Sequence, residues 1–306
     1  MKKRLKFSQI NISTGRFVIL ILLFFLLIMG FIILLNKKID LTSKIAVIPL
    51  EGTIGYYDSL TNQGINPDDI VSYIEDANKN KNIKAIILEI DSPGGTVVAS
   101  EQIANAVSKS KKPVVAFIRE IGASGAYWVA SSSDRIIASR MSVTGSIGVT
   151  SSYIEFSKLM EKYGITYHSL KAGDYKEIGS PYTGLSKEEE RVLQNTINKI
   201  YDYFIEQVSI NRNISKSKVK EIATGMIYLG EEAKDIGLID DIGDKEFAIK
   251  KAKELANITD AELVRYEKKE TLLDVLSRIS SRSFYFIGKG IGSVFVSADR
   301  EIKFEV

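Results

Sequence analysis

Residues 83–95, IKAIILEIDSPGG, join a strand pattern to a glycine turn. The run at 83–90 is short and rich in β-branched side chains, which is typical of a buried strand in a parallel sheet. The paired glycines of DSPGG follow at the end of this strand, before a helical pattern begins. Their backbone N–H groups can stay free there and bind a phosphate or hold an oxyanion. A tight turn without chemistry is the alternative interpretation.

Two further runs, residues 44–50 (KIAVIPL) and 113–118 (PVVAFI), have the same strand pattern. Helical patterns lie between the strands. One begins at Asn66, where a cap residue, a proline and two acidic residues match the preferences of a helix N-terminus, and a second covers residues 99–110. This alternation of strands and helices predicts an α/β layered domain.

A longer helix is predicted after residue 186. Ser186 and Glu189 have the spacing of a capping box, and apolar residues then recur at helical spacing as far as Val208. We expect this helix to cover one face of the sheet or to form an oligomer interface, with ordinary core packing as the simpler interpretation. Shorter helices are predicted at 217–224 and 246–256.

The composition excludes several classes of protein. The chain has 306 residues, of which 45% are apolar, with no cysteine and a single histidine, His168. Disulfide frameworks, zinc fingers, iron–sulfur clusters and thiol nucleophiles are excluded, and a histidine-based metal site is not expected. Five basic residues and no acidic residue lie within 1–16, so the rest of the chain is nearly neutral. The net charge of +3 therefore gives no support for a nucleic-acid-binding body.

Residues 17–35, FVILILLFFLLIMGFIILL, contain no charge and are long enough to cross a bilayer as one helix. A cleaved signal peptide is the alternative, but its apolar region is usually shorter and ends at a small-x-small cleavage site. We therefore expect an uncleaved single-pass anchor in the cytoplasmic membrane. Because the basic flank precedes the anchor, the positive-inside rule places the N-terminus in the cytoplasm and the body outside it.

Two serines lie at junctions where chemistry could occur. Ser124, in GASGAYW (122–128), stands between small residues at a predicted helix start, where a substrate backbone could approach it. The same position would also suit a plain helix cap. Ser146, in TGSIGV (144–149), lies in a segment that by itself indicates only a turn.

A nucleophilic serine needs a base. His168 lies in the alternating run at 165–170, which predicts a strand and a structural role. A lysine could serve instead, although holding a lysine neutral at pH 7 costs roughly 4–5 kcal/mol unless its site lowers the pKa. Ser-x-x-Lys spacings occur only in charged stretches without the partner motifs of that catalytic class, and we interpret them as chance.

Five motifs occur along the chain: DSPGG (91–95), GASGAYWVA (122–130), TGSIGV (144–149), KAGDYKEIGSP (171–181) and GMIYLGEEAKDIGLIDDIG (225–243). Together, in this order, they resemble the signal peptide peptidase A proteases of peptidase family S49, in the short bacterial form. The resemblance extends from about residue 45 to residue 256. It implies an α/β fold like that of caseinolytic protease and crotonase, built of repeated strand-strand-helix units, and a homo-oligomer on the membrane.

The resemblance also assigns site residues. Ser124 matches the nucleophile, Lys176 matches the general base, and Ser146 matches the serine that orients the lysine. Gly94 and Gly95 match the glycines whose N–H groups form the oxyanion hole. One departure is Ala126, where family members commonly have a second glycine after the serine.

The implied activity is that of a serine endopeptidase with a Ser-Lys dyad, which degrades remnant signal peptides and needs no metal or cofactor. A general extracytoplasmic quality-control protease and a noncatalytic scaffold or acyl-CoA binder of the same fold are the alternatives. The expected organisation is a basic cytoplasmic flank (1–16), an anchor (17–35), an extracytoplasmic protease domain (41–256) and a C-terminal extension (257–306) with an apolar run (284–296).

Overall fold

The computed structural model describes residues 22–25, 28, 42–56 and 64–267. The chain divides into two compact units, residues 1–42 and 43–306, and the second contains the body. Within the described ranges, no helix is both long enough and apolar enough to span a bilayer. Apart from residues 22–25 and 28, which are helical, the predicted anchor lies outside the described residues, as do the flank at 1–16 and the run at 284–296.

The body alternates strands and helices along most of its length. The strands are β1 (Lys44–Glu51), β2 (Thr53–Ile54), β3 (Gly64–Ile65), β4 (Ile83–Ser92), β5 (Val114–Ala123), β6 (Arg135–Ala138), β7 (Val143–Gly145), β8 (Ile227–Leu229), β9 (Asp241–Ile242) and β10 (Glu262–Arg265). The helices are α2 (Pro67–Lys79), α3 (Val97–Ser108), α4 (Gly125–Ser131), α5 (Ser157–Lys162), α6 (Lys187–Arg212), α7 (Lys216–Ile222), α8 (Gly230–Asp235) and α9 (Lys245–Leu255).

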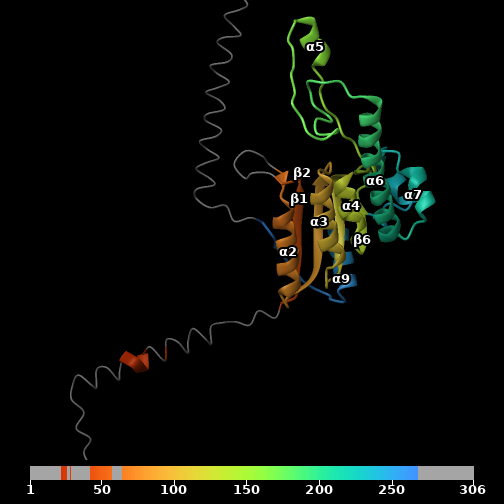
Figure 1. Cartoon of the computed structure of the whole chain (residues 1–306). Helices are drawn as coiled ribbons and strands as arrows, with labels where there is room; N and C mark the ends of the chain where they lie inside the picture. Colours follow the sequence, from red (N-terminus) through yellow and green to blue (C-terminus); the bar gives the residue numbers. More distant parts are fainter. Residues whose placement is uncertain (1–21, 26–27, 29–41, 57–63, 268–306) are drawn as a thin grey trace, which may run out of the picture. The chain divides into compact units, whose positions relative to one another are not determined.

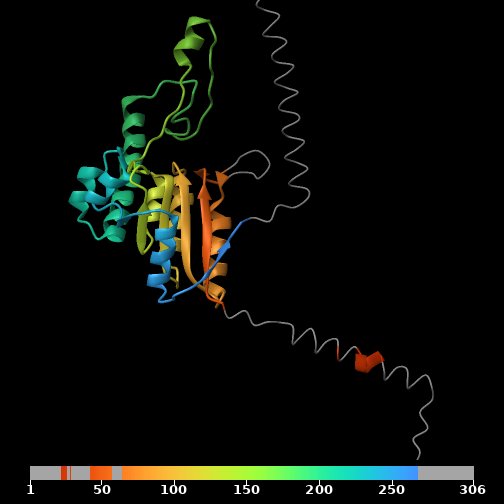
Figure 2. The same ribbon diagram turned by 180° about the vertical axis from the view of Figure 1, so that it is seen from behind.

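The central sheet has the strand order β10-β1-β4-β5-β6-β9, and all of these pairs are parallel. β7 pairs in parallel with the last residues of β5 and antiparallel with β8. Helices α2, α3 and α4 cover one face of the sheet (Figure 1), and α9 covers the other (Figure 2). The predicted α/β layered domain is confirmed.

The strands are hydrophobic on both faces because helices lie on both sides. In β4, Ile86, Leu88 and Ile90 pack in the larger core beneath α2, α3 and α4, whereas Ala85 and Ile87 pack in the smaller core beneath α9. Parallel strands all end at the same edge of a sheet. The glycine turn after β4 and the serine after β5 are thereby brought to one place.

Several boundaries differ from the sequence-based expectation. β5 continues to Ala123, beyond the apolar run, because Gly122 still pairs with Ser92 of β4 and with Thr144 of β7. The capping box of α6 is confirmed, but only Phe204, Ile205 and Val208 of this helix are buried. Its first half therefore extends past the core.

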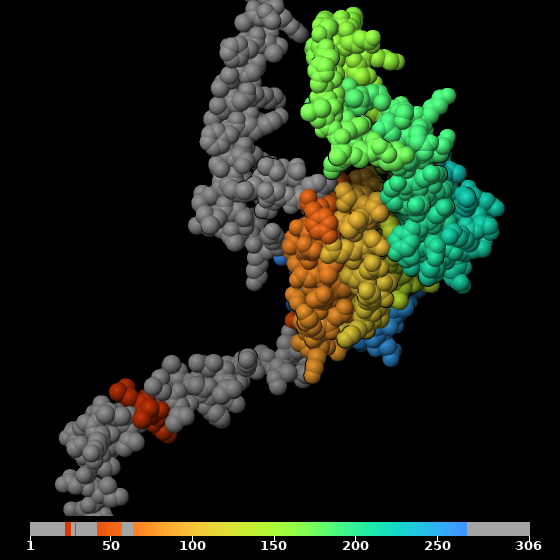
Figure 3. Space-filling view, in the orientation of Figure 1, coloured from red at the N-terminus to blue at the C-terminus, as the bar shows by residue number. Residues whose placement is uncertain are grey.

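The prediction of a strand at 165–170 is wrong. These residues have no regular structure and are exposed, including His168. They belong to the segment 150–185, which contains α5 and projects away from the sheet (Figures 1 and 3). An alternating pattern forms a strand only where a neighbouring strand can pair with it, and none lies beside this segment in the described structure.

Candidate functional site

Ser124 lies at the turn between β5 and α4, with φ of 54° and ψ of −126°. This is a costly conformation for a residue with a side chain, and it persists only where the surroundings impose it. The Ser124 N–H donates to the Gly145 carbonyl at 2.8 Å, and its own carbonyl accepts from the Trp128 N–H at 3.0 Å. The strained turn is thus held on both sides, and the side chain is half-buried rather than enclosed.

Ser146 follows β7 in the same way and also has a positive φ, 50°. Ala123 and Gly145 are paired residues of β5 and β7, so the two serines that follow them are neighbours. The Ser146 N–H donates to the Met226 carbonyl at 2.8 Å.

Ser124 and Ser146 line one cavity of about 500 Å³. Its other walls come from the loop after Ser146, from α6 and from the turn before β8. Those lining residues are Gly148, Val149, Thr150, Gln194, Ile197, Asn198, Tyr201, Ala223, Thr224 and Gly225. The cavity mixes apolar and amide side chains, and it is large enough to admit part of a peptide.

The glycine turn after β4 packs directly against Ser124. Gly94 has φ of +98°, and a Cβ placed on it would lie 2.7 Å from the Gly125 nitrogen and 2.9 Å from the Ser124 Cβ. Any side chain at Gly94 would therefore collide with Ser124 or with the backbone beside it. The Gly94 N–H donates to Ser92 Oγ at 3.1 Å, which holds the turn closed.

Two other backbone N–H groups near Ser124 have no hydrogen-bond acceptor among the described residues. Neither the Gly95 N–H nor the Gly125 N–H donates a hydrogen bond within the described part of the chain. The two glycines are close, because a Cβ built on Gly125 would lie 3.4 Å from the Gly95 nitrogen. Such a pair of unsatisfied donors can hold an oxyanion. Sequence reasoning missed Gly125, although the first N–H groups of a helix always lack an intrahelical acceptor.

Lys176 does not lie at this cavity. It lies in a turn of the projecting segment, is exposed, and is not among the residues that line the cavity. Its N–H donates to the Gly173 carbonyl at 3.2 Å. The structure thus brings together Ser124, Ser146 and the glycine turn, but not Lys176. Among the described residues, no cluster of acidic or histidine side chains could hold a metal ion.

Comparisons with known proteins agree with this architecture. The sequence profile of Peptidase family S49 matches residues 106–259, about half of the chain. "Putative protease MJ0651" of Methanocaldococcus jannaschii is 38% identical over 93% of this chain and 96% of its own length. "Putative signal peptide peptidase SppA" of Enterococcus faecium is 34% identical over 77% of this chain and 69% of its own length. The chain belongs to peptidase family S49.

Among solved structures, this S49 peptidase resembles the membrane-bound, stomatin-specific protease 1510-N. The TM-score is 0.50 and the identity 19%, over 74% of this chain and 99% of that one. At this identity the likeness concerns the fold alone. Family membership makes the protein a serine-type peptidase, whereas the roles of Ser124, Lys176, Ser146, Gly94 and Gly95 stay predictions.

In this S49 peptidase, contacts on two sides hold α4, the helix that follows Ser124, in place. Tyr127 is fully buried and its hydroxyl donates to the Leu238 carbonyl at 2.9 Å. Burial raises the pKa of Tyr127, so its hydroxyl remains a donor. Trp128 stacks on Phe204 of α6, with ring centroids 5.1 Å apart. α4 therefore cannot shift without disturbing α6 and the cavity wall.

Proposed function

We propose that this S49 peptidase is a membrane-anchored serine endopeptidase that degrades remnant signal peptides after their release from secreted proteins. The observation that carries the proposal is that Ser124 and Ser146 line one cavity. Next to Ser124, the N–H groups of Gly125 and Gly95 lie close together and have no acceptor in the described part of the chain. The name of the Enterococcus faecium relative supports the substrate class.

In the proposed reaction, Ser124 Oγ attacks a peptide carbonyl while Lys176 takes its proton. The carbonyl oxygen becomes negative and accepts hydrogen bonds from the free N–H groups of the glycine turn and of Gly125. The amine product leaves with a proton, and water then hydrolyses the acyl-enzyme. Ser146 orients the lysine.

The position of Lys176 adds a requirement. Because this side chain is exposed and outside the cavity of its own chain, the projecting segment must deliver it to a Ser124 hydroxyl, either by moving or by reaching another copy. A lysine acts as a base only when neutral, and enclosure in the cavity favours the neutral form. A homo-oligomer, in which another copy supplies the lysine, is part of the proposal.

The remaining parts of the proposal concern location. Residues 17–35 anchor the chain in the cytoplasmic membrane, with the flank at 1–16 inside and the fold of the caseinolytic protease and crotonase type outside. An anchor of this kind would hold the site beside substrates that partition into lipid.

The test measures cleavage of a quenched fluorescent peptide with a signal-peptide sequence by Ser124→Ala and Lys176→Ala. We expect each variant to lose at least about 10³-fold in kcat/KM, and Lys158→Ala, a control in the same segment, to keep full activity. Undiminished cleavage by either variant refutes the dyad. Mixing the two inactive variants restores activity only if serine and lysine come from different copies. Faster cleavage of an unfolded protein than of signal peptides would instead favour quality control.

A further inference from the structure

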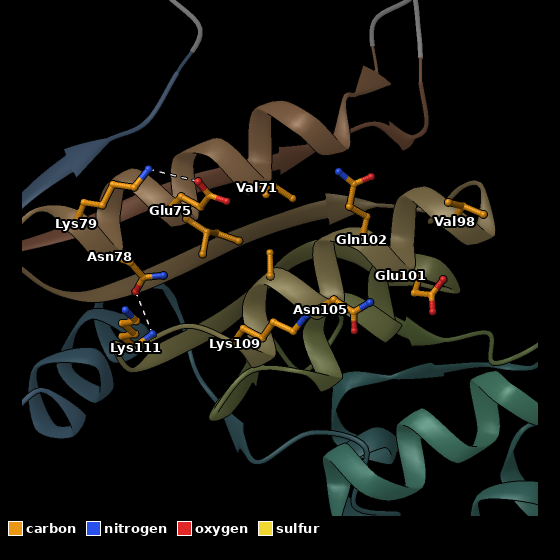
Figure 4. Close-up of a pocket in the computed structure, with 12 residues that line it drawn as sticks. Val71, Glu75, Asn78, Lys79, Val98, Glu101, Gln102, Asn105, Lys109 and Lys111 are labelled. Atoms are coloured by element: carbon orange, nitrogen blue, oxygen red, sulfur yellow. Dashed lines mark hydrogen bonds and ion pairs between the residues drawn. The ribbon is translucent and has the colours of Figure 1, made fainter.

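A groove runs between α2 and α3 on the outer surface of the helix layer (Figure 4). Its volume is about 710 Å³, larger than the cavity at Ser124. The buried side chain of Ile74 and that of Ala106 contribute to its apolar lining, and Val98 at one end is 63% exposed. The rim carries both signs of charge, as on Glu75 and Lys109. The floor of the groove is thus apolar and its rim polar, which suits one face of an amphipathic helix.

The described chain ends against one of the two helices that form the groove. The ring of Tyr266 packs edge-on against Tyr73 of α2, with centroids 5.8 Å apart. The Tyr266 N–H donates to the Val47 carbonyl at 2.9 Å, so the chain is still attached to the sheet at this point. The Tyr266 side chain therefore points to the same side of the sheet as the groove, one residue before the described chain ends.

The sequence that follows has the pattern of an amphipathic helix. Residues 271–283 are TLLDVLSRISSRS, and Thr271 and Asp274 have the spacing of a capping box. Leu272, Leu276 and Ile279 then recur at helical spacing, while the opposite side carries serine, aspartate and arginine. A helix this short is marginal alone in water, so its apolar stripe needs cover.

We propose that residues 271–283 form a helix that fills the α2–α3 groove of their own chain, with the stripe of Leu272, Leu276 and Ile279 on the groove floor. The helix would be about 20 Å long, which matches the 13 residues of α2. Residues 267–270 can extend about 13–14 Å, which exceeds the roughly 10–12 Å diameter of a helix. The linker is therefore long enough to cross α2 and enter the groove.

Disulfide trapping tests the proposal in the full chain, which contains no native cysteine. Cysteine is placed in the groove by Val98→Cys or Ala106→Cys, and in the segment by Leu272→Cys, Leu276→Cys or Ile279→Cys. The matched controls, Asp274→Cys and Ser281→Cys, lie on the polar side. We expect bonds within one chain from the stripe positions, at least about tenfold faster than from the controls and independent of protein concentration. Equal trapping from the stripe and control positions, or no trapping at all, would overturn the proposal. Disulfide bonds that form only between chains would also overturn it, because they would place a second copy in the groove.

A second variant tests the groove without an added bond. Val98→Asp puts a charge on the apolar lining and should expose the segment, so that trypsin cuts after Arg278 about tenfold faster than in the unchanged protein. Met141→Asp is the control, because Met141 is equally exposed, at 66%, and lies outside the groove. Equal cleavage rates in the two variants would contradict docking of the segment in the groove.

Discussion

The packing around Gly125, the residue after the proposed nucleophile, leaves no room for a side chain. A Cβ at this position would overlap Ser100 Oγ, which is itself buried and donates to the Thr96 carbonyl at 2.9 Å. α3 and α4 can approach each other closely only because residue 125 is glycine. The free Gly125 N–H owes its position beside Gly95 to the same contact.

Gly125→Ala is therefore expected to cost about 1–3 kcal/mol in the free energy of unfolding and to lower kcat/KM by at least about tenfold, because the two N–H groups separate. Urea denaturation and peptide cleavage measure the two effects. Adding Ser100→Ala to the Gly125→Ala variant should restore part of the lost stability and part of the lost activity. Gly184→Ala is the control, because its Cβ would meet only ordinary contacts; a matching loss in that variant would refute the packing argument.

Glu89 is a second residue with a specific role, because it is a buried acid on the face of the sheet beneath α9. It accepts from Lys245 at 2.8 Å and from Arg265 at 2.6 Å. Burial by itself would raise the pKa of the Glu89 carboxyl, but these hydrogen bonds outweigh it and the pKa is lowered. The ionised form is thus more favourable in the folded chain than in the unfolded one.

Glu89→Gln should lower the free energy of unfolding at pH 7 by about 1–3 kcal/mol, since both cations are partly exposed and screened. A lowered pKa gives stability that is present above the unfolded value, near 4.3, and is lost as pH falls through the folded value. The difference between the two proteins should therefore shrink below about pH 5 in urea titrations. Glu188→Gln, which removes an exposed pair with Arg191, should change stability by under about 0.5 kcal/mol. A difference at Glu89 that grows on acidification would contradict this account.

Among the elements, α4 is short and depends on tertiary contacts. All seven of its residues are buried, and α6 contacts it through the stacked pair of Trp128 and Phe204. The Tyr127 hydroxyl also ties α4 to the chain before β9. α4 thus serves as a rigid base for the strained turn at Ser124.

Tyr127→Phe removes a single hydroxyl and leaves the buried Leu238 carbonyl without this donor. We expect a loss of about 1–2 kcal/mol in the free energy of unfolding, measured by urea denaturation, together with a smaller loss of activity. Tyr163→Phe, at an exposed tyrosine of the projecting segment, should have no effect on stability. If Tyr127→Phe were as stable as the unchanged protein, the hydrogen bond to Leu238 would not anchor α4.

At the scale of the whole molecule, the projecting segment carries apolar side chains that the described part of its own chain leaves uncovered. Tyr153, Ile154, Tyr163 and Ile165 are between 46% and 70% exposed, and Leu170 is fully exposed. A surface this apolar is typical of an interface. In the proposed homo-oligomer, another copy covers it.

Leu170→Asp should leave the free energy of unfolding of one chain within about 0.5 kcal/mol, because the side chain loses no contact. If the segment forms the interface, light scattering will show a lower mass at the same concentration, and activity will fall with it. Lys187→Asp, at the exposed start of α6, is a control for the added negative charge. An unchanged mass and activity in Leu170→Asp would exclude Leu170 from the assembly.

Side-chain patterns alone predict the strands at 44–50, 83–90 and 113–118, the helices between them, and the capping box at Ser186. These features depend on side-chain periodicity and on backbone groups a few residues apart, so local chemistry is sufficient to predict them. The motifs around Ser124 and Ser146 also identified the family. Only the tertiary structure decided that the two serines are neighbours, since the pairing of β5 with β7 joins residues that are distant in sequence. The tertiary structure also shows that Ser92 accepts from the Gly94 N–H, whereas the N–H groups of Gly95 and Gly125 have no acceptor among the described residues, and that Lys176 lies outside the cavity. Hydrogen-bond partners and burial follow from packing between elements rather than from residue spacing.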